Sequence, residues 1–184
     1  MLEIRNAVSD DDLNGILKLQ QENLPYAISA EEATSQGFVT VIHDFHLLKR
    51  MNTAAAHVIA VDGERVIGYC LSMPKEFRNE IPVLVPMFQL FDRLKWDGVP
   101  LFDVKYIVMG QVCVAKTHRG QSVFDNLYRS FCDKHRSKFE VILTEIAMRN
   151  ERSLRAHQRI GFEVIHKYQA EDAENWLVVA LKLH

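Results

Sequence analysis

Hydrophobic positions along the chain follow two periods, one of two residues and one of three to four residues. The apolar runs His57–Val61 and Arg65–Leu71 flank Asp62-Gly63, a pair that readily adopts positive φ, so a β-hairpin is predicted here. Alternating or β-branched segments predict further strands over Leu2–Val8, Val104–Ala115, Phe139–Ala147, Phe162–Tyr168 and Trp176–Leu183.

Segments with apolar residues at helical spacing lie between these strands. Ser9 with Asp12 three residues later is a capping-box pattern, and it precedes the apolar positions Leu13 and Ile16. Helices are predicted after Ser9, from Ser29 to Gly37, over Asp44–Met51, from Val123 to Phe131 and from Asn150 to Gly161. This order of elements predicts an α/β (α+β) fold with a mixed central β-sheet flanked by helices.

Two segments fit neither period well. Phe38–Ile42 is rich in β-branched residues and is ambiguous between strand and loop. Prolines bracket the apolar part of Pro74–Pro100, in which Met87–Trp96 predicts at most a short helix. The segment Pro74–Pro100 is either an excursion that covers a substrate or a decorated connection between strands, and the pattern leaves both open.

The composition is that of a soluble globular domain. Of the 184 residues, 48% are hydrophobic and 25% are charged. Because no repeat and no Pro/Gly/Ser-rich linker divides the chain, we expect residues 1–184 to form a single domain. The 22 basic and 24 acidic residues give a net charge of −2, which disfavours a dedicated nucleic-acid binder and a disordered chain.

Cysteine usage and hydropathy favour a cytoplasmic protein without a metal. The three cysteines form no CxxC pair, so free thiols are expected. His43 and His46 stand three residues apart but lack a third ligand at a useful spacing, so we expect no metal site. The N-terminus lacks a signal-peptide pattern, and Ile81–Phe91 is too short to span a bilayer. We therefore expect a cytoplasmic location and neither a membrane nor a nucleic acid as partner.

The first chemically informative segment is a strand, a polar turn and a helix over Gln111–Phe124. A turn that delivers backbone N–H groups to a helix N-terminus can bind an anion, because the first helical amides lack partners and the helix dipole is positive there. Gly120 lets the backbone approach a phosphate closely, and Lys116, His118 and Arg119 add positive or potentially positive charge. By itself this pattern more often marks an ordinary turn before a helix than a phosphate site.

The second segment follows one strand-length after the first helix, from Asn150 to Phe162. Asn150 at a helix cap can present its amide to a ligand that lies between strands. His157 lies about two helical turns further on, near the same face, and Gly161 ends the helix.

Together these segments resemble the GNAT acyltransferase superfamily. Val112-Cys113-Val114 followed by Arg119-Gly120-Gln121-Ser122 is similar to the family's V-x-V strand and its acyl-CoA pyrophosphate motif R/Q-x-x-G-x-G/A. The second segment is similar to N-x-x-(A/S)-x-x-x-Y-x-x-x-G-F, read here as Asn150, Ser153, His157, Gly161 and Phe162. The resemblance covers most of the chain except Pro74–Pro100. It implies a GNAT fold, with a sheet of about six to seven strands whose strands 4 and 5 splay.

The resemblance also implies a function. A GNAT enzyme moves an acetyl group from acetyl-CoA, its co-substrate, to an amine of a small molecule or peptide by direct attack on the thioester. It needs no metal, and a homodimer is common for the fold. The residues that the resemblance places at the cofactor are Val112, Cys113, Val114, Arg119, Gly120, Gln121, Ser122, Val123, Asn150 and Ser153.

Two positions depart from the family pattern. Ser122 stands where a second glycine is usual, and it either adds a hydroxyl donor or tightens the loop through its β-carbon. His157 stands where the family commonly has a tyrosine, taken there as the general acid for the leaving thiolate. An imidazole with its ordinary pKa of ~6.5 can protonate a thiolate of pKa ~8.5. A histidine that only packs the helix is an equal alternative.

The general base is not assigned by the sequence, because no acidic residue falls on the predicted fourth strand Val104–Ala115. Glu76, Asp103 and Tyr106 are the nearest candidates. The missing carboxylate keeps a second reading open, a catalytically silent acyl-CoA-binding or regulatory module on the same fold. A third reading, an RNA- or protein-interaction domain without CoA, has only the basic helix end Arg129–Lys138 in its favour.

Overall fold

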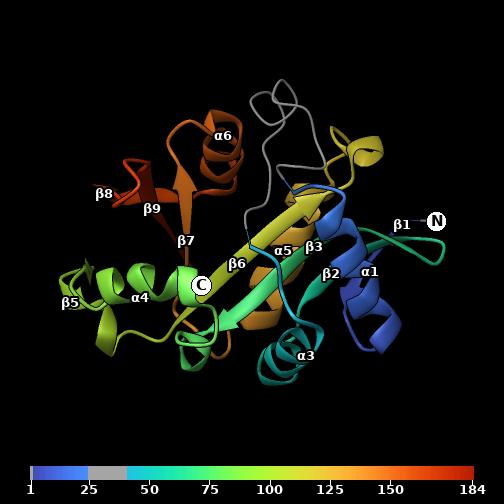
Figure 1. Ribbon diagram of the computed structural model, residues 1–184, viewed down its shortest axis with the longest axis horizontal. Helices are drawn as coiled ribbons and strands as arrows, with labels where there is room; N and C mark the ends of the chain where they lie inside the picture. Colours follow the sequence, from blue (N-terminus) through green and yellow to red (C-terminus); the bar gives the residue numbers. More distant parts are fainter. Residues whose placement is uncertain (1, 25–40) are drawn as a thin grey trace. The chain divides into compact units, whose positions relative to one another are not determined.

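The computed structural model describes residues 2–24 and 41–184 (Figure 1). The helix predicted from Ser29 to Gly37 and most of Phe38–Ile42 lie outside the described residues. The chain divides into two compact units, which are described separately. The first unit comprises Met1–Ser72 and Met109–His135, and the second comprises Met73–Val108 and Arg136–His184.

Each unit combines strands with helices, and β6 contributes to both. The first unit contains β1 (Leu2–Asn6), α1 (Asp10–Gln21), α3 (Phe45–Ala54), β2 (Val58–Asp62), most of β3 (Arg65–Pro74), the end of β6 (Tyr106–Val114), the 3-10 turn η4 (Lys116–His118) and α5 (Val123–His135). The second unit contains η1 (Lys75–Phe77), η2 (Pro82–Leu84), α4 (Val85–Phe91), β4 (Lys95–Trp96), β5 (Val99–Pro100), η3 (Leu101–Asp103), the start of β6, β7 (Val141–Ala147), α6 (Glu151–Ile160), β8 (Glu163–Gln169) and β9 (Asn175–Lys182).

The sheet confirms the predicted mixed architecture. Seven strands follow the order β1-β2-β3-β6-β7-β9-β8, and β4 pairs with β5 in a separate two-stranded sheet that the sequence pattern did not predict. The predicted fourth and fifth strands are β6 and β7, which run parallel, with Tyr106 opposite Val141 and Val108 opposite Leu143. Their divergence beyond these residues stays a prediction.

The β2–β3 hairpin forms as predicted, but its turn lies one residue further along. Asp62 pairs with Arg65, so the turn residues are Gly63 and Glu64 rather than Asp62 and Gly63. Gly63 has φ 60°, and glycine at the first position of a two-residue turn supplies the positive φ that matches the twist of the strands.

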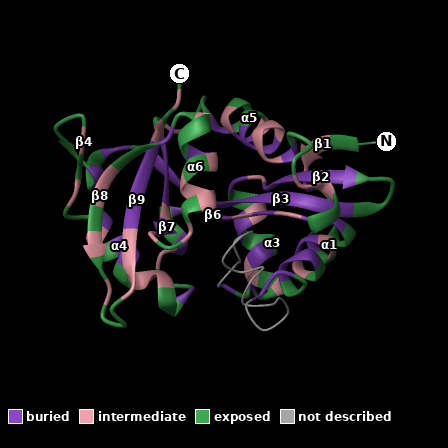
Figure 2. Ribbon diagram, turned by 90° about the horizontal axis from the view of Figure 1, so that it is seen from above, coloured by how far each residue is buried: buried purple, intermediate pink, exposed green. Residues whose placement is uncertain are grey.

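Local signals and close contacts fix α1 and α5 in the first unit. The predicted capping box of Ser9 and Asp12 is present at the start of α1. Gly15 and Gly68 allow close packing, because a β-carbon at Gly15 would lie 2.6 Å from Val66 Cγ2 and one at Gly68 would lie 3.1 Å from Leu127 Cδ1. Figure 2 shows β2 and β3 buried along most of their length.

His43 and His135 are buried in the first unit. His135 belongs to the predicted basic helix end, yet it is 2% exposed, with Nε2 3.0 Å from the Ser72 hydroxyl. His43 precedes α3 rather than sharing a helical face with His46, and it is 4% exposed. The Nε2 amide of Gln20 lies 2.9 Å from His43 Nδ1. His43 is therefore a core residue, because contacts from distant segments bury the ring.

The register of β7, β9 and β8 divides the sheet of the second unit into two faces. Paired residues place their side chains on the same face, and alternate residues on opposite faces. Ile142 lies opposite Leu181, whose Cδ1 would be 3.4 Å from a β-carbon on Gly161, so this is the face toward the end of α6. The other face begins with Tyr106, which packs edge-on against Phe91 of α4 at 6.0 Å between ring centroids.

Candidate functional site

The turn between β6 and α5 has the backbone shape of an anion site. Gly120 and Ser122 both have left-handed backbones, with φ 77° and φ 58°. The carbonyl of Ser122 accepts the first helical hydrogen bond, from the amide of Asn126 at 3.0 Å, so α5 starts directly after the turn. Gly120, Gln121 and Ser122 are exposed. The turn therefore presents consecutive backbone amides and a helix N-terminus to solvent.

The polar side chains of the turn brace it. Arg119 donates through Nε to the carbonyl of Val114 at 3.0 Å and through a terminal nitrogen to Asn23 Oδ1 at 2.8 Å. Gln121 Nε2 donates to the carbonyl of Thr117 at 3.1 Å. These bonds hold the turn against β6, and anion binding by its backbone amides stays a prediction.

Open space next to Gly120 fits a phosphate. A β-carbon built on Gly120 would meet no atom within 4 Å, so the missing side chain leaves the amides uncovered. An acyl-CoA carries a diphosphate, and the turn offers the small residue and the amide groups that such an anion needs. The residues present therefore fit this part of the co-substrate.

Ser122 explains why a glycine is usual at its position. A left-handed backbone costs a residue with a β-carbon about 1 kcal/mol, and glycine avoids that cost. The φ of 58° places Ser122 in this region, and the choice between a hydroxyl donor and a loop tightened by the β-carbon stays a prediction.

The strand before the turn carries no nucleophile. Cys113 is 8% exposed, and burial raises the pKa of its thiol to about 12. Its thiol is therefore protonated at neutral pH and belongs to the core. Val112 and Val114 alternate with it and are half-buried. The amide of Ala115 donates to the carbonyl of Ile67 at 2.8 Å, which ties the end of β6 to β3.

The second group of predicted residues lies together on α6, in the second unit. Asn150 caps the helix, and its Oδ1 accepts the amide of Ser153 at 3.1 Å. His157 is 2% exposed, its Nδ1 lies 2.8 Å from the carbonyl of Ser153, and its ring packs edge-on against Phe162. Gly161 ends the helix in the left-handed region, as predicted.

Burial lowers the pKa of His157 to about 4, so the imidazole is neutral at neutral pH. Since Nδ1 faces a carbonyl oxygen, it carries the proton and donates it to the backbone. This environment favours the packing role for His157 over that of a general acid, although the acid role stays a prediction that a substitution can test.

The structure reveals one titratable group that sequence reasoning missed. Glu145 lies in the interior strand β7, and burial raises the pKa of its carboxyl group to about 7. The hydroxyl of Tyr168 on β8 donates to Glu145 Oε1 at 2.8 Å. The available sequence signal was a single acidic residue within the apolar run Val141–Ala147.

The base candidates considered from the sequence have different surroundings. Glu76 and Asp103 are exposed in the short turns η1 and η3. Burial raises the pKa of Tyr106 to about 12, and its hydroxyl has no hydrogen-bond partner among the described residues. Of Glu145 and Tyr106, Glu145 has the pKa closer to neutrality.

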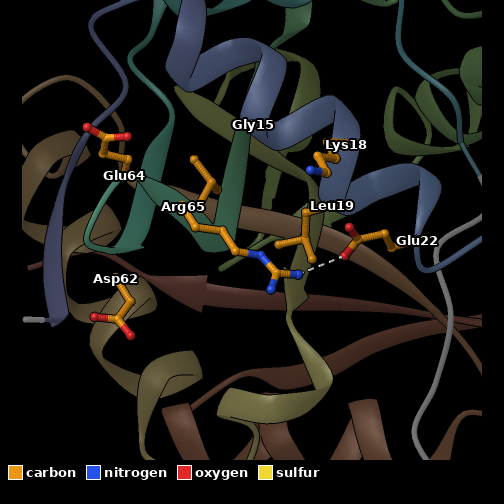
Figure 3. Close-up of a pocket in the computed structure, with 8 residues that line it drawn as sticks. Gly15, Lys18, Leu19, Glu22, Asp62, Glu64 and Arg65 are labelled. Carbon is orange, nitrogen blue, oxygen red and sulfur yellow. Dashed lines mark hydrogen bonds and ion pairs between the residues drawn. The ribbon is translucent and has the colours of Figure 1, made fainter.

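A cavity of about 390 Å³ lies elsewhere in the first unit, between α1 and the β2–β3 hairpin (Figure 3). Its rim mixes both charges, and Arg65 pairs with Glu22 at 3.3 Å. None of the residues predicted to bind the cofactor lines it. The described residues hold no group of three or more metal-binding side chains. None of the described helices is long and apolar enough to cross a membrane.

Comparisons with known proteins agree with the turn and the fold. The family model described as the acetyltransferase (GNAT) family matches residues 14–162. No curated protein matches the chain in sequence.

Solved structures share the fold at low identity. The ribosomal-protein-S18-alanine N-acetyltransferase from Escherichia coli is 11% identical, with a TM-score of 0.62, covering 100% of this chain and 94% of that one. The yncA protein from Salmonella typhimurium, solved with its cofactor acetyl-CoA, is 17% identical, with a TM-score of 0.62 and the same coverage of 100% and 94%. A chain of the NatC complex bound to Gag peptide and CoA is 15% identical, with a TM-score of 0.66, covering 100% and 99%.

The family match spans well over half of the chain and includes the β6–α5 turn and all of α6. The predicted sheet and the left-handed turn before α5 are both present. The chain therefore belongs to the GNAT family of acetyltransferases.

Proposed function

We propose that this chain transfers the acetyl group of acetyl-CoA to a primary amine carried by a peptide or a small molecule. The observation that carries the proposal is the exposed turn at Gly120–Ser122, whose left-handed backbone leads directly into α5. One structural neighbour is named a ribosomal-protein-S18-alanine N-acetyltransferase, and another was solved in a complex bound to a peptide and CoA. Both support a peptide amine as one acceptor class.

The proposed cofactor contacts follow from the chain's own geometry. The backbone of Arg119–Val123 would hold the diphosphate, and Val112–Val114 would align the pantetheine arm. Asn150 and Ser153 would contact the cofactor from α6, in addition to their capping bond at 3.1 Å. When bound, acetyl-CoA supplies a thioester that is activated for attack by an amine.

The reaction needs the acceptor as a neutral amine. An alkylammonium group has an ordinary pKa of ~10.4, so a base must first take one proton. The nitrogen lone pair then forms a bond to the acetyl carbonyl carbon, the carbon–sulfur bond breaks, and sulfur leaves with the electron pair. One further proton leaves the nitrogen, and one is returned to the thiolate.

Replacing Gly120 by alanine tests the turn. Gly120→Ala is expected to weaken acetyl-CoA binding at least tenfold, because the new β-carbon would fill the open space that the diphosphate needs. The measurement is the rise in melting temperature with increasing acetyl-CoA, since a ligand that binds only the native state stabilises it.

Gly98→Ala is the matched control. Gly98 lies in the β4–β5 turn with φ 82°, close to the 77° of Gly120, and a β-carbon there would also meet no atom within 4 Å. Both substitutions are expected to cost about 1 kcal/mol of stability, but only Gly120→Ala should reduce the ligand-induced shift. No shift of the unmodified protein with acetyl-CoA or CoA would reject the proposal. A shift without thiol release across a broad amine panel would instead favour the catalytically silent module.

His157→Phe tests the general acid. Because His157 is buried and neutral, we expect the substitution to lower turnover less than about tenfold. Loss of a positioned general acid would lower the rate 10²–10⁴-fold. Thiol release is measured at saturating acetyl-CoA, with cofactor affinity determined in parallel. A loss of 100-fold or more at unchanged affinity and unchanged melting temperature would instead establish His157 as the acid.

We also propose a cytoplasmic location and a single cooperative domain. Cys70, Cys113 and Cys132 form no disulfide, which suits a reducing compartment. A homodimer, which the fold often forms, would elute as such in size-exclusion chromatography.

A further inference from the structure

One face of the second unit's sheet gathers a carboxyl group and three aromatic rings. Glu145 on β7 lies opposite Val178 on β9, which lies opposite His166 on β8. In the next row, Ala147 lies opposite Trp176, which lies opposite Tyr168. Because paired residues and residues two apart share a face, Glu145, His166, Tyr168 and Trp176 lie on one face, here called the amine face.

The amine face is accessible without being fully exposed. All four of its side chains are half-buried. The rings of His166 and Tyr168 are stacked, with 6.4 Å between centroids and 19° between planes. Further along the same face the sheet is closed, since Tyr106 is buried against Phe91 of α4. The polar part of the face is thus partly exposed beside an apolar core.

The Glu145 carboxyl group has no cationic side chain as a partner among the described residues. Its hydrogen-bond partner in the described part of the chain is the Tyr168 hydroxyl, at 2.8 Å, and no lysine or arginine of that part pairs with it. The other titratable groups of the face are His166, Tyr106, Lys182 and the exposed Glu163, and Lys182 pairs with Asp97 at 3.1 Å. Burial destabilises the charged carboxylate relative to the neutral acid, and no positive partner offsets this cost. Burial therefore raises the pKa of Glu145 to about 7.

We propose that the amine face binds the ammonium group of the acceptor and that Glu145 takes its proton before attack on the thioester. This inference rests on the proposed N-acetyltransferase function. A carboxylate attracts an ammonium group directly, and aromatic rings attract a cation through their π faces, indole most strongly. The acceptor class is therefore a primary amine that is cationic at neutral pH and is carried by an aliphatic or peptide chain.

The proton transfer balances within the site. A proton and its positive charge pass from R–NH₃⁺ to the Glu145 carboxylate, which leaves R–NH₂ with a free lone pair and Glu145 as a neutral acid. Solvent regenerates the carboxylate after turnover. Glu145 touches the reacting nitrogen in this scheme and is a catalytic residue. Tyr168 is a positioning residue, because its hydroxyl fixes one carboxylate oxygen and leaves the other for the ammonium group.

Intrinsic fluorescence tests the binding step without acetyl-CoA. The protein has two tryptophans, so Trp96→Phe leaves Trp176 as the reporter on the amine face. Titration with n-butylammonium chloride at pH 8 is expected to change this fluorescence saturably, whereas equal concentrations of n-butanol plus sodium chloride should not. At pH 5.5, where Glu145 is protonated, the affinity should fall at least tenfold. An equal response to the alcohol, or an unchanged affinity at pH 5.5, would overturn the proposal.

Substitutions then separate the two proposals. Glu145→Gln is expected to lower kcat/KM for a primary-amine acceptor at least 100-fold and to leave the acetyl-CoA thermal shift intact. Glu140→Gln, at an exposed residue just before β7, is the matched loss of one negative charge and should change neither. If the unmodified protein turns over and Glu145→Gln does so equally, the amine-face inference fails while the proposed function stands. If the unmodified protein neither shifts with acetyl-CoA nor releases thiol, the proposed function fails instead.

Tyr168→Phe tests whether Tyr168 positions the Glu145 carboxylate. The readout is the pH–rate profile, which a merely structural role would not shift. The hydrogen bond from Tyr168 lowers the pKa of Glu145, so its loss should move the acidic limb of the pH–rate profile upward by roughly 0.5–1 unit. The plateau at high pH should be less affected than the rate at pH 7. A limb at the unchanged pH would exclude the positioning role.

Discussion

Acidification from pH 7 to pH 4 is expected to lower the free energy of unfolding by several kcal/mol. Three buried histidines have lowered pKa values, because burial disfavours their charged form: about 4 for His43, about 3 for His57 and about 4 for His157. Once unfolded, each regains an ordinary pKa of ~6.5. Between pH 6.5 and pH 4 the unfolded chain therefore binds more protons, and stability is lost as the pH falls.

At two of these rings, a hydrogen bond in the core acts alongside burial against protonation. His57 Nδ1 accepts the amide of Ser72 at 3.0 Å, and Gln20 Nε2 lies 2.9 Å from His43 Nδ1. A proton on either Nδ1 would remove an acceptor within the core. Each ring contributes on the order of 3 kcal/mol to the loss at pH 4.

Glu145 acts in the opposite direction within the same window. Its carboxyl group has a raised pKa, so the folded chain binds the extra proton between pH 7 and about 4.5, and stability is gained there as the pH falls. Asp12 has a lowered pKa, held by Arg5, and its contribution is lost only at still lower pH. At pH 5.5 three histidines take up protons on unfolding and one glutamate releases one, a net uptake of about two.

Denaturant unfolding at pH 7, 6, 5.5 and 5 measures this effect. A net uptake of two protons corresponds to a slope of about 2.7 kcal/mol per pH unit near pH 5.5. Glu145→Gln removes the opposing group and should steepen the slope. A free energy of unfolding that is constant between pH 7 and pH 5 would contradict the neutral, buried state of these histidines.

Gln111→Leu is expected to destabilise the protein by about 3 kcal/mol or more. Gln111 on β6 accepts at Oε1 from the Tyr69 hydroxyl at 2.5 Å and from Gln20 Nε2 at 2.7 Å. Its own Nε2 donates to the carbonyl of Val41 at 3.0 Å. Leucine would leave two donors and one carbonyl without this partner in the core, and a buried unpaired polar group costs about 1–3 kcal/mol.

A double substitution isolates the cause. Tyr69→Phe removes one of the stranded donors, so Gln111→Leu should cost less in the Tyr69→Phe background than in the unmodified protein. Urea unfolding of the two single variants and the double variant gives this coupling energy. Strict additivity would show that the loss comes from packing rather than from the hydrogen bonds.

Structural features that depend on neighbouring residues were predicted well from the sequence. Ser9 and Asp12 form the expected capping box, Asn150 caps α6, and Gly161 ends it in the left-handed region. These features depend on residues within one or two turns, so the local sequence decides them. The unexpected β4–β5 hairpin lies in the proline-bracketed segment whose pattern fitted neither period.

The candidate site likewise has parts that depend on neighbouring residues and parts that depend on tertiary contacts. The sequence alone determined the β6–α5 turn and the family, because the positions that require small residues and backbone amides are contiguous in the chain. Only the tertiary structure decided which groups can exchange protons. His157 is neutral because the core encloses it. Burial in the sheet raises the pKa of Glu145 to near neutrality, and the hydrogen bond from Tyr168 lowers it only in part. Proton affinity depends on solvent and on neighbouring charges in space, and neither is recorded in the order of residues.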